Sequence, residues 1–209
     1  MSIALFDFDG TLCRGDSVVP YLLFAIRKGF APRRQLLRAA GAWLRQKTHP
    51  GTVARAKETT LSFISGRTVA EMDALARDFF REVQQKKCFA DGIAELNRLR
   101  SEGTEVLVVS ASAEVWMRVL PEFLPVDRVI ATPCQVDAQG RYTGHIAVNC
   151  RGEEKLRLAA PYLTGEISAA YGDSAGDAPM LRLAKHPVLV NPKPALKKLL
   201  PDAEIRQWR

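Results

Sequence analysis

The chain has 209 residues and a net charge of +7, with 47% hydrophobic and 25% charged residues, which is ordinary for a soluble globular protein of one domain with an insert or two small domains. No apolar run reaches 18 residues and no basic leader precedes the first apolar run, so we expect no transmembrane segment, no signal peptide and a cytoplasmic location. Cys13, Cys88, Cys134 and Cys150 are widely spaced without a Cys-x-x-Cys pair, which argues against a zinc site or a disulfide scaffold and favours reduced thiols.

The first predicted element is a buried strand over residues 3–6, because this apolar run is too short for an amphipathic helix. Asp7 and Asp9 follow it. If the extended form persists, both carboxylates lie on one face at the carboxyl end of the strand, where open parallel sheets place their ligands. Gly10 lets the backbone approach such a ligand. Two carboxylates this close need a cation or a shared proton. An Asp-Gly turn with solvated carboxylates remains the simpler alternative for this motif alone.

A helical block follows, over about residues 17–87. Its helices are predicted at 17–28, 33–46, 52–64 and from 69, the last begun by a Thr68–Glu71 capping box. Between Gly15 and Ala70 there are ten Lys or Arg residues and two acidic ones, so this segment carries a charge of +8. It would attract phosphate esters, nucleic acid or acidic lipid, although a solvated basic surface explains the count equally well.

From residue 89 onward, helices and strands alternate. Helices are predicted at 91–101, 114–120, 153–162, 179–184 and 194–200, strands at 104–110, 126–132, 166–171 and 187–191, and a hairpin at 134–148. This alternation predicts an α/β fold with a Rossmann-like, doubly wound parallel sheet. The helical block cannot join that sheet. We therefore expect a core of residues 1–14 and 89–209 and an inserted all-helical cap of residues 15–88.

Polar side chains end three of the predicted core strands, and a lysine stands near the start of a helix. These residues are Asp7 and Asp9, Ser110, Asp173 and Asp177, and Lys155. Strand ends of a doubly wound sheet gather at one edge. Carboxylates, a hydroxyl and an ammonium together suit phosphoryl transfer through an aspartyl-phosphate with Mg²⁺.

Three motifs carry a resemblance to a known family: Asp7-Phe-Asp-Gly-Thr11, Val108-Val-Ser110 and Gly172-Asp-Ser-Ala-Gly-Asp177. In order and spacing they resemble the signatures of the haloacid dehalogenase-like hydrolase superfamily. The helical insert after the first motif, and Val190-Asn-Pro192 after the last, resemble the phosphoserine-phosphatase-like branch (subfamily IB, with a helical C1 cap).

The resemblance implies a role for each motif residue. Asp7 would be the nucleophile and Asp9 the general acid and base. Mg²⁺ would be held by Asp7, the backbone carbonyl of Asp9 and Asp173, with Asp177 as a ligand or a support. The substrate phosphate would contact a set of residues from the first two motifs: Gly10, Thr11, Ser110 and Ala111.

Other positions leave alternatives open. Both Arg151 and Lys155 could be the phosphate-binding cation; Gly152-x-x-Lys155 resembles related lipid-phosphate phosphatases, and we favour Lys155. Asp16 falls where phosphoserine phosphatases read the substrate amine, but it can equally cap a helix. Ser112 could help to bind phosphate, but we favour a role as the cap of the following helix. Lys57 and Arg55 are candidate substrate contacts from the cap.

The sequence thus predicts a Mg²⁺-dependent phosphatase that acts on a small phosphorylated metabolite. Gly10 and Gly176 depart from the phosphoserine phosphatase pattern, so phosphoserine itself is one alternative and a lipid phosphate of the phosphatidylglycerophosphate type is another. Phosphoryl transfer to an alcohol differs only in the acceptor. A non-enzymatic basic module that binds RNA is disfavoured, because every catalytic residue type is present. We expect no nucleic acid partner, a monomer or homodimer, and at most weak peripheral contact with anionic lipid.

Overall fold

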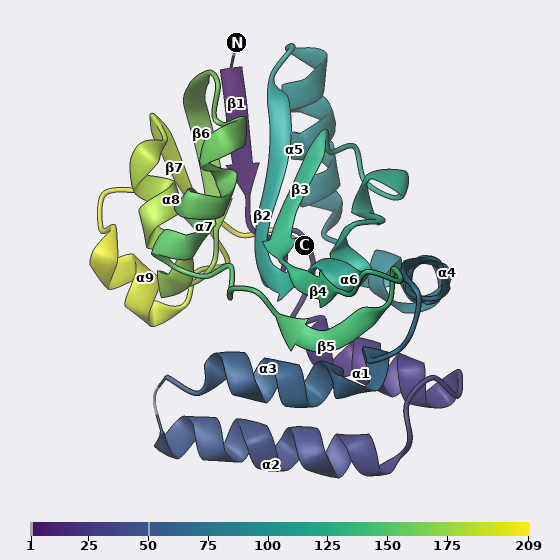
Figure 1. The fold of residues 1–209 in the computed structure, drawn as a ribbon. Helices are drawn as coiled ribbons and strands as arrows, with labels where there is room; N and C mark the ends of the chain where they lie inside the picture. The colour runs from purple at the N-terminus through teal and green to yellow at the C-terminus, as the bar shows by residue number, and fades with distance from the viewer. Residues whose placement is uncertain (1, 50) are drawn as a thin grey trace.

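The computed structural model describes residues 2–49 and 51–209. Its centre is a parallel six-stranded sheet with the strand order β3-β2-β1-β6-β7-β8 (Figure 1). The chain moves outward from β1 on one side, then returns to add β6 on the other, so the strand order reverses beside β1. This confirms the predicted Rossmann-like α/β fold. The strands are β1 (Ser2–Phe6), β2 (Glu105–Ala113), β3 (Arg128–Thr132), β6 (Glu166–Gly172), β7 (His186–Val190) and β8 (Glu204–Arg206).

Alternating side chains of the strands build two apolar layers, one on each face of the sheet. Ile3 and Leu5 of β1 pack into one layer with helices α7 to α9, whereas Ala4 and Phe6 pack into the other with α5 and the helical insert. Burial of both faces explains why these strands are apolar throughout. The core helices are α5 (Ala90–Ser101), α6 (Glu114–Met117), α7 (Glu153–Ala159), α8 (Ala178–Leu183) and α9 (Pro194–Leu199).

The segment between β1 and α5 is helical, as predicted. Thr68 and Glu71 form the expected reciprocal capping box at the start of α4. In Figure 1, α2 is the outermost helix of the insert and α3 lies between it and the core. None of the helices in residues 2–49 and 51–209 is long and apolar enough to cross a membrane. The helices are α1 (Val18–Arg27), α2 (Arg34–Thr48), α3 (Val53–Leu61) and α4 (Val69–Phe79), and a π-helical turn, Phe80–Gln84, extends the last.

A hairpin from the second half of the chain packs against this insert. It consists of β4 (Cys134–Val136) and β5 (Tyr142–Ile146). The backbone N–H of Gly66 donates to the carbonyl of Tyr142 at 2.8 Å, and the N–H of Tyr142 donates to the carbonyl of Arg67 at 2.8 Å. The helical insert is therefore completed by a segment that the sequence assigns to the core.

Strand β1 ends at Phe6 as predicted, but the extended conformation does not continue through Asp7 and Asp9. The strand stops at Phe6, and the chain turns so that the N–H groups of Leu12 and Cys13 donate to the carbonyl of Phe8 at 2.9 and 3.0 Å. Gly10 adopts a φ of +90° in this turn, which favours glycine. Asp7 and Asp9 therefore do not share one extended stretch. Strand β8 was also not predicted, because its three residues are largely exposed and show no apolar period.

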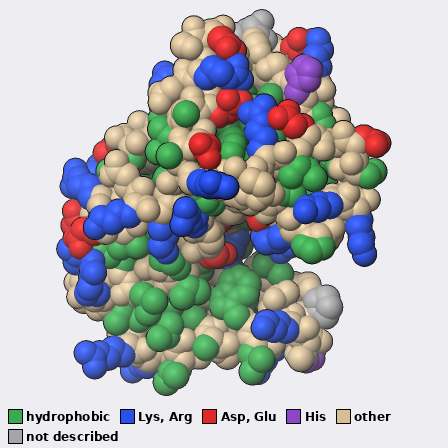
Figure 2. Space-filling model, turned by 180° about the vertical axis from the view of Figure 1, so that it is seen from behind, with side chains coloured by type: hydrophobic (Ala, Val, Ile, Leu, Met, Phe, Trp, Pro, Cys, Tyr) green, Lys and Arg blue, Asp and Glu red, His purple; other side chains and the backbone are tan. Residues whose placement is uncertain are grey.

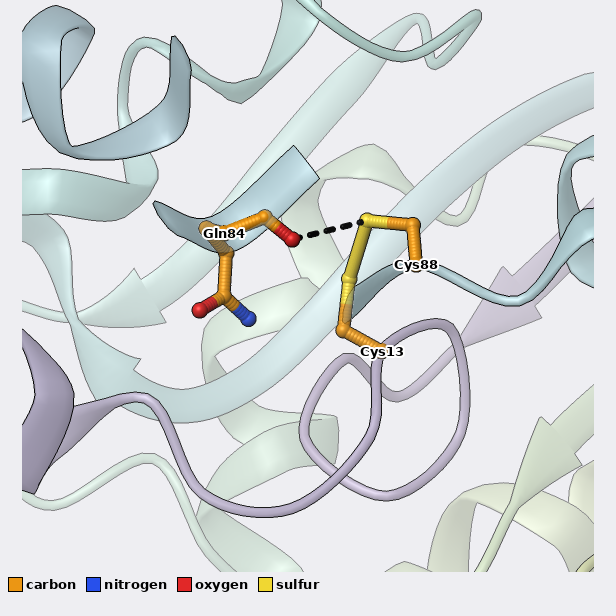
Figure 3. Close-up of a disulfide and its surroundings, with 3 residues drawn as sticks. All are labelled: Cys13, Gln84 and Cys88. Atoms are coloured by element: carbon orange, nitrogen blue, oxygen red, sulfur yellow. Dashed lines mark hydrogen bonds between the residues drawn. A yellow bond between two sulfur atoms is a disulfide. The ribbon is translucent and has the colours of Figure 1, made fainter. Parts of the chain in front are cut away.

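The prediction of reduced thiols is wrong for one pair of cysteines. Cys13 and Cys88, which are 75 residues apart, form a disulfide (Figure 3). The segments that enter and leave the helical insert run side by side here, because the N–H of Arg14 donates to the carbonyl of Lys87 at 2.9 Å. Cys134 and Cys150 are buried free thiols. Pairing of the two linkers is a tertiary feature that cysteine spacing cannot indicate.

Candidate active site

A cavity of about 410 Å³ lies between the carboxyl ends of the core strands and the helical insert. Residues from both sides line it. The core supplies Asp7, Asp9, Ser110, Lys155, Asp173 and Asp177, and the insert supplies Asp16, Val18, Trp43, Val53 and Lys57. The carboxyl edge of the sheet therefore brings together the polar strand-end residues that the sequence singles out.

Lys155 links two carboxylates at the base of this cavity. Its Nζ lies 2.6 Å from Oδ1 of Asp7 and 2.6 Å from Oδ1 of Asp177, and only 1% of the residue is exposed. The hydroxyl of Thr11 donates to the other oxygen of Asp7 at 3.3 Å. Lys155 comes from the first turn of α7 and Thr11 from the turn after β1. The carboxylate of Asp7 is thus fixed from both of its oxygens.

Burial dominates the charge state of this group. It raises the pKa of Asp7 to about 8, with the negative charge of Asp177 adding to the effect and Lys155 opposing it. Burial would also raise the pKa of Asp177, but Lys155 and Ser174 hold it below its usual value. Asp7 and Asp177 raise the pKa of Lys155 above its usual value although burial opposes this, so the lysine stays protonated.

Carboxylate oxygens of Asp7, Asp173 and Asp177 all lie within 4.8 Å of one another and are buried. Three buried carboxylates meet two ammonium groups here, the buried one of Lys155 and that of Lys193, whose Nζ lies 2.6 Å from Oδ2 of Asp173. About one negative charge is left without compensation, and the donors are all hard oxygens. Both properties fit a divalent cation such as Mg²⁺. Gly10 keeps this side of the group open, because a Cβ at this residue would lie 2.4 Å from Oδ2 of Asp173.

Asp9 has different surroundings. Its Oδ2 accepts hydrogen bonds from the hydroxyls of Ser17, at 3.0 Å, and Ser112. Its Oδ1 is buried and has no hydrogen-bond partner within the described part of the chain. Burial, together with the nearby Asp16, raises the pKa of Asp9 to about 7 in spite of the two serines. Asp9 can therefore hold or release a proton near neutral pH.

The end of β2 forms the opposite wall. Ser110 is 1% exposed and its hydroxyl accepts a hydrogen bond from the N–H of Ser112 at 3.0 Å. The carbonyl of Ala111 accepts a hydrogen bond from Nζ of Lys57 at 2.5 Å. Lys57 belongs to α3, so an ammonium from the insert reaches the end of the strand that carries Ser110.

Comparison with known proteins identifies the family. Residues 4–182 match the family model described as haloacid dehalogenase-like hydrolase. The chain is a haloacid dehalogenase-like hydrolase. The hydrolase is 27% identical over 98% of its length to 73% of "Probable phosphatase Rv3661" from Mycobacterium tuberculosis. It is 29% identical over 99% of its length to 70% of "Phosphoserine phosphatase SerB1" from the same organism.

The fold agrees with this assignment. A crystal structure of a protein with unknown function from Bordetella pertussis superposes with a TM-score of 0.84, at 24% identity, over 98% of this hydrolase and 97% of that chain. The hydrolase thus belongs to the phosphoserine-phosphatase-like branch, as its motifs predict, and is an enzyme of phosphatase type.

The two candidate cations of the hydrolase lie in different places. Lys155 is buried between carboxylates, whereas Arg151 is exposed and stands beside Gly176. A Cβ at Gly176 would lie only 3.2 Å from Nε of Arg151, so the glycine makes room for this side chain. Asp16 lines the cavity, and its Oδ1 accepts a hydrogen bond from the N–H of Val18 at 2.7 Å, so its carboxylate supports the start of α1 although Ser17 is the N-cap residue. Its contact with a substrate stays a prediction.

Sequence reasoning missed the serines that hold Asp9. Ser112 does not cap the next helix as predicted, since Ala113 precedes α6 and the Ser112 hydroxyl bonds Asp9 instead. Ser17 donates to Asp9 and accepts from the indole N–H of Trp116 at 3.1 Å. The only sequence signal was a second serine two residues after Ser110. Arg55, a candidate substrate contact, is exposed and does not line the cavity.

Proposed function

We propose that this hydrolase cleaves phosphate monoesters through a covalent phosphoryl group on Asp7, with Mg²⁺ as its cofactor. The observation that carries the proposal is the contrast between two carboxylates on one turn. Asp7 is held by Lys155 beside two further carboxylates, whereas Asp9 lines the same cavity and has a buried oxygen without a hydrogen-bond partner among the described residues. One residue is arranged to attack and the other to carry a proton.

In the first step, a carboxylate oxygen of Asp7 attacks phosphorus and the bond between phosphorus and the ester oxygen breaks. Asp9, with a pKa of about 7, gives its proton to the leaving alkoxide. Lys155 and the hydroxyl of Ser110 balance the charge on the phosphoryl oxygens. In the second step, ionised Asp9 takes a proton from water, the water oxygen bonds phosphorus, and the bond to Asp7 breaks to release phosphate.

Asp7 and Asp173 would hold Mg²⁺ together with the Asp9 backbone carbonyl, and Asp177 would ligate or support it. The bound ion would neutralise the attacking carboxylate and the phosphate, so that both can approach. We assign residues 15–88 as the cap that closes the site and selects the substrate. Its contribution to the cavity is mixed, with an apolar part from Val18, Trp43 and Val53 and a cation from Lys57.

We propose a small phosphorylated metabolite as the substrate, because a cavity of about 410 Å³ has the size of pockets that bind small molecules. Phosphoserine and a lipid phosphate remain the alternatives. Two local features separate this site from the phosphoserine phosphatase pattern. A side chain at residue 10 would meet Asp173, and Arg151 fills the space beside Gly176. The guanidinium at this mouth favours a substrate with a second anionic or polar group.

The test is a phosphate-release screen over phosphorylated metabolites, phosphoserine and short-chain lipid phosphates, with Mg²⁺ and with EDTA. We expect release with Mg²⁺, loss with EDTA, and loss in Asp7→Asn. Ser168→Ala, on β6 away from the cavity, serves as the matched control and should retain activity. Activity that survives either EDTA or Asp7→Asn would overturn the mechanism, and wild-type inactivity on every ester would overturn the function.

A further inference from the structure

The outer face of α2 carries exposed leucines. The inner face packs on α3 and on the turn after it: the indole N–H of Trp43 donates to Thr60 at 3.0 Å, and the side-chain amide of Gln35 donates to the hydroxyl of Ser62 at 2.9 Å. Leu37 and Leu44, two turns apart, point the opposite way and are 76% and 66% exposed. Leucines so exposed on one line of a helix form an unpartnered apolar stripe.

Cations flank this stripe without acidic residues. No Asp or Glu occurs between Ser17 and Lys57. Arg34, Arg38 and Arg45 recur at helical spacing along one side of the leucines, and all are exposed. Among the described residues none of these three arginines forms an ion pair, whereas Arg27 and Lys28 of the same insert are 2.5 and 2.6 Å from Glu82. The charge of these three arginines is therefore uncompensated within the described part of the chain.

We propose that this face of α2, defined by Leu37, Leu44, Arg34, Arg38 and Arg45, docks the protein onto an anionic lipid surface. Leucines on a helix that lies in the interface plane enter the boundary between headgroups and acyl chains, and flanking arginines contact lipid phosphates. Charge complementarity selects this occupant. A second copy of the chain would bring like charges together, and a nucleic acid would leave the two leucines in water.

The position of α2 allows such contact. It is the outermost helix of the insert in Figure 1, and from behind, in Figure 2, the lowest part of the molecule displays hydrophobic and basic side chains without acidic ones. Trp43 on the inner face of the same helix lines the cavity. A bilayer bound to the outer face would thus contact the helix that shapes one wall of the site. The docking does not depend on which ester the enzyme cleaves.

The experiment measures binding of the full chain to phosphatidylcholine vesicles with and without about 30% phosphatidylglycerol. We expect binding only to the anionic vesicles, and a fall when salt rises from about 0.05 M to about 0.5 M, because the screening length shortens. Arg34→Gln/Arg38→Gln should weaken binding on the order of 30-fold. Leu37→Asn/Leu44→Asn should weaken it roughly tenfold.

Two variants of core residues outside α2, on α8 and α9, are matched controls. Lys197→Gln/Lys198→Gln removes the same charge from α9, and Leu183→Asn/Leu199→Asn removes leucines that are 49% and 45% exposed. Both should bind within about twofold of wild type, since their residues lie outside α2. Thermal unfolding of every variant verifies the fold. Hydroxyl-radical oxidation of the unmodified protein adds a measurement without substitutions: vesicles should protect Leu37 and Leu44 but not Leu183 and Leu199.

Four results would overturn the proposal. The first is no binding of wild type to anionic vesicles at low salt. The second is an equal loss in the α9 controls, which would make the attraction a property of net charge. The third is a dimer that Leu37→Asn/Leu44→Asn dissociates, because the occupant would then be a second copy. The fourth is binding through α2 to duplex DNA or RNA but not to vesicles.

Discussion

Nζ of Lys57 lies 2.5 Å from the carbonyl oxygen of Ala111, so a cation from α3 of the helical insert is fixed to the end of β2, directly after Ser110. The same ammonium contacts the side-chain oxygen of Asn149 and lies 3.4 Å from the hydroxyl of Thr132. It is 4% exposed, and burial lowers its pKa to about 8 although nearby acids oppose the shift. The helical insert and the sheet are therefore joined beside the site by a buried charge.

The buried charge of Lys57 should lower the free energy of unfolding at neutral pH. Above pH 8 the folded protein releases a proton that the unfolded chain keeps until about pH 10.5, so wild-type stability gains from this group as pH rises between these values. Lys57→Met lacks that gain. We expect the stability of the variant relative to wild type to fall by up to about 3 kcal/mol between pH 7 and pH 10.5, measured by urea unfolding. The exposed Lys47→Met should change the free energy of unfolding at pH 7 by less than about 0.5 kcal/mol. A relative stability that is constant with pH would contradict the assignment.

Substitutions of Lys155 and Arg151 should change different kinetic constants. Lys155→Met removes the ammonium that contacts Asp7, and we expect kcat to fall by roughly 10²- to 10³-fold. Arg151→Met removes an exposed guanidinium at the cavity mouth, so KM should rise while kcat stays within about threefold. Steady-state kinetics at saturating Mg²⁺ distinguish the two, and thermal unfolding verifies that Lys155→Met is folded. Intact turnover in Lys155→Met with loss in Arg151→Met would reverse the assignment.

Asp9 should set an alkaline limb in the pH profile. The first step needs its protonated form, so kcat/KM is expected to fall as pH rises through about 7. The hydroxyl of Ser112 donates to the ionised form and lowers this pKa. Ser112→Ala should therefore raise the pKa and move the limb upward by roughly half a unit. Ser168→Ala provides the control profile. A limb that stays in place or moves to lower pH would exclude this role.

Much of the site was predictable because its residues end strands or begin helices. Lys155 stands 148 residues from Asp7, yet a lysine in the first turn of a helix in the α/β alternation must reach the carboxyl edge of the sheet. The hydrogen-bond partner of Ser112 was not predictable in the same way. A serine before a helix has the same hydrogen-bonding capacity whether it caps that helix or bonds Asp9. Only the actual end of β2, at Ala113, decides between the two.

The path of the chain around the insert could not be predicted from the sequence either. The hairpin that packs on the insert and the pairing of the two linkers depend on contacts between segments far apart in the chain. Strand β8 pairs with β7 at the edge of the sheet, and Glu204 and Ile205 are exposed, so no apolar pattern marks it. Local patterns therefore defined the core, and tertiary contacts defined how the insert is held to it.

The Cys13–Cys88 disulfide should stabilise the protein at this junction. It closes a loop of 75 residues, and restricting the unfolded chain by such a loop contributes up to about 4 kcal/mol. We expect a reducing agent to lower the free energy of unfolding by an amount of this order, and Cys13→Ser to lower it similarly and to abolish the response to reductant. Cys134→Ser, which removes a free thiol, should keep that response. Urea unfolding with and without reductant measures the effect, and thiol labelling in denaturant should find two free cysteines. Four free thiols, or a stability that reductant leaves unchanged, would contradict the disulfide.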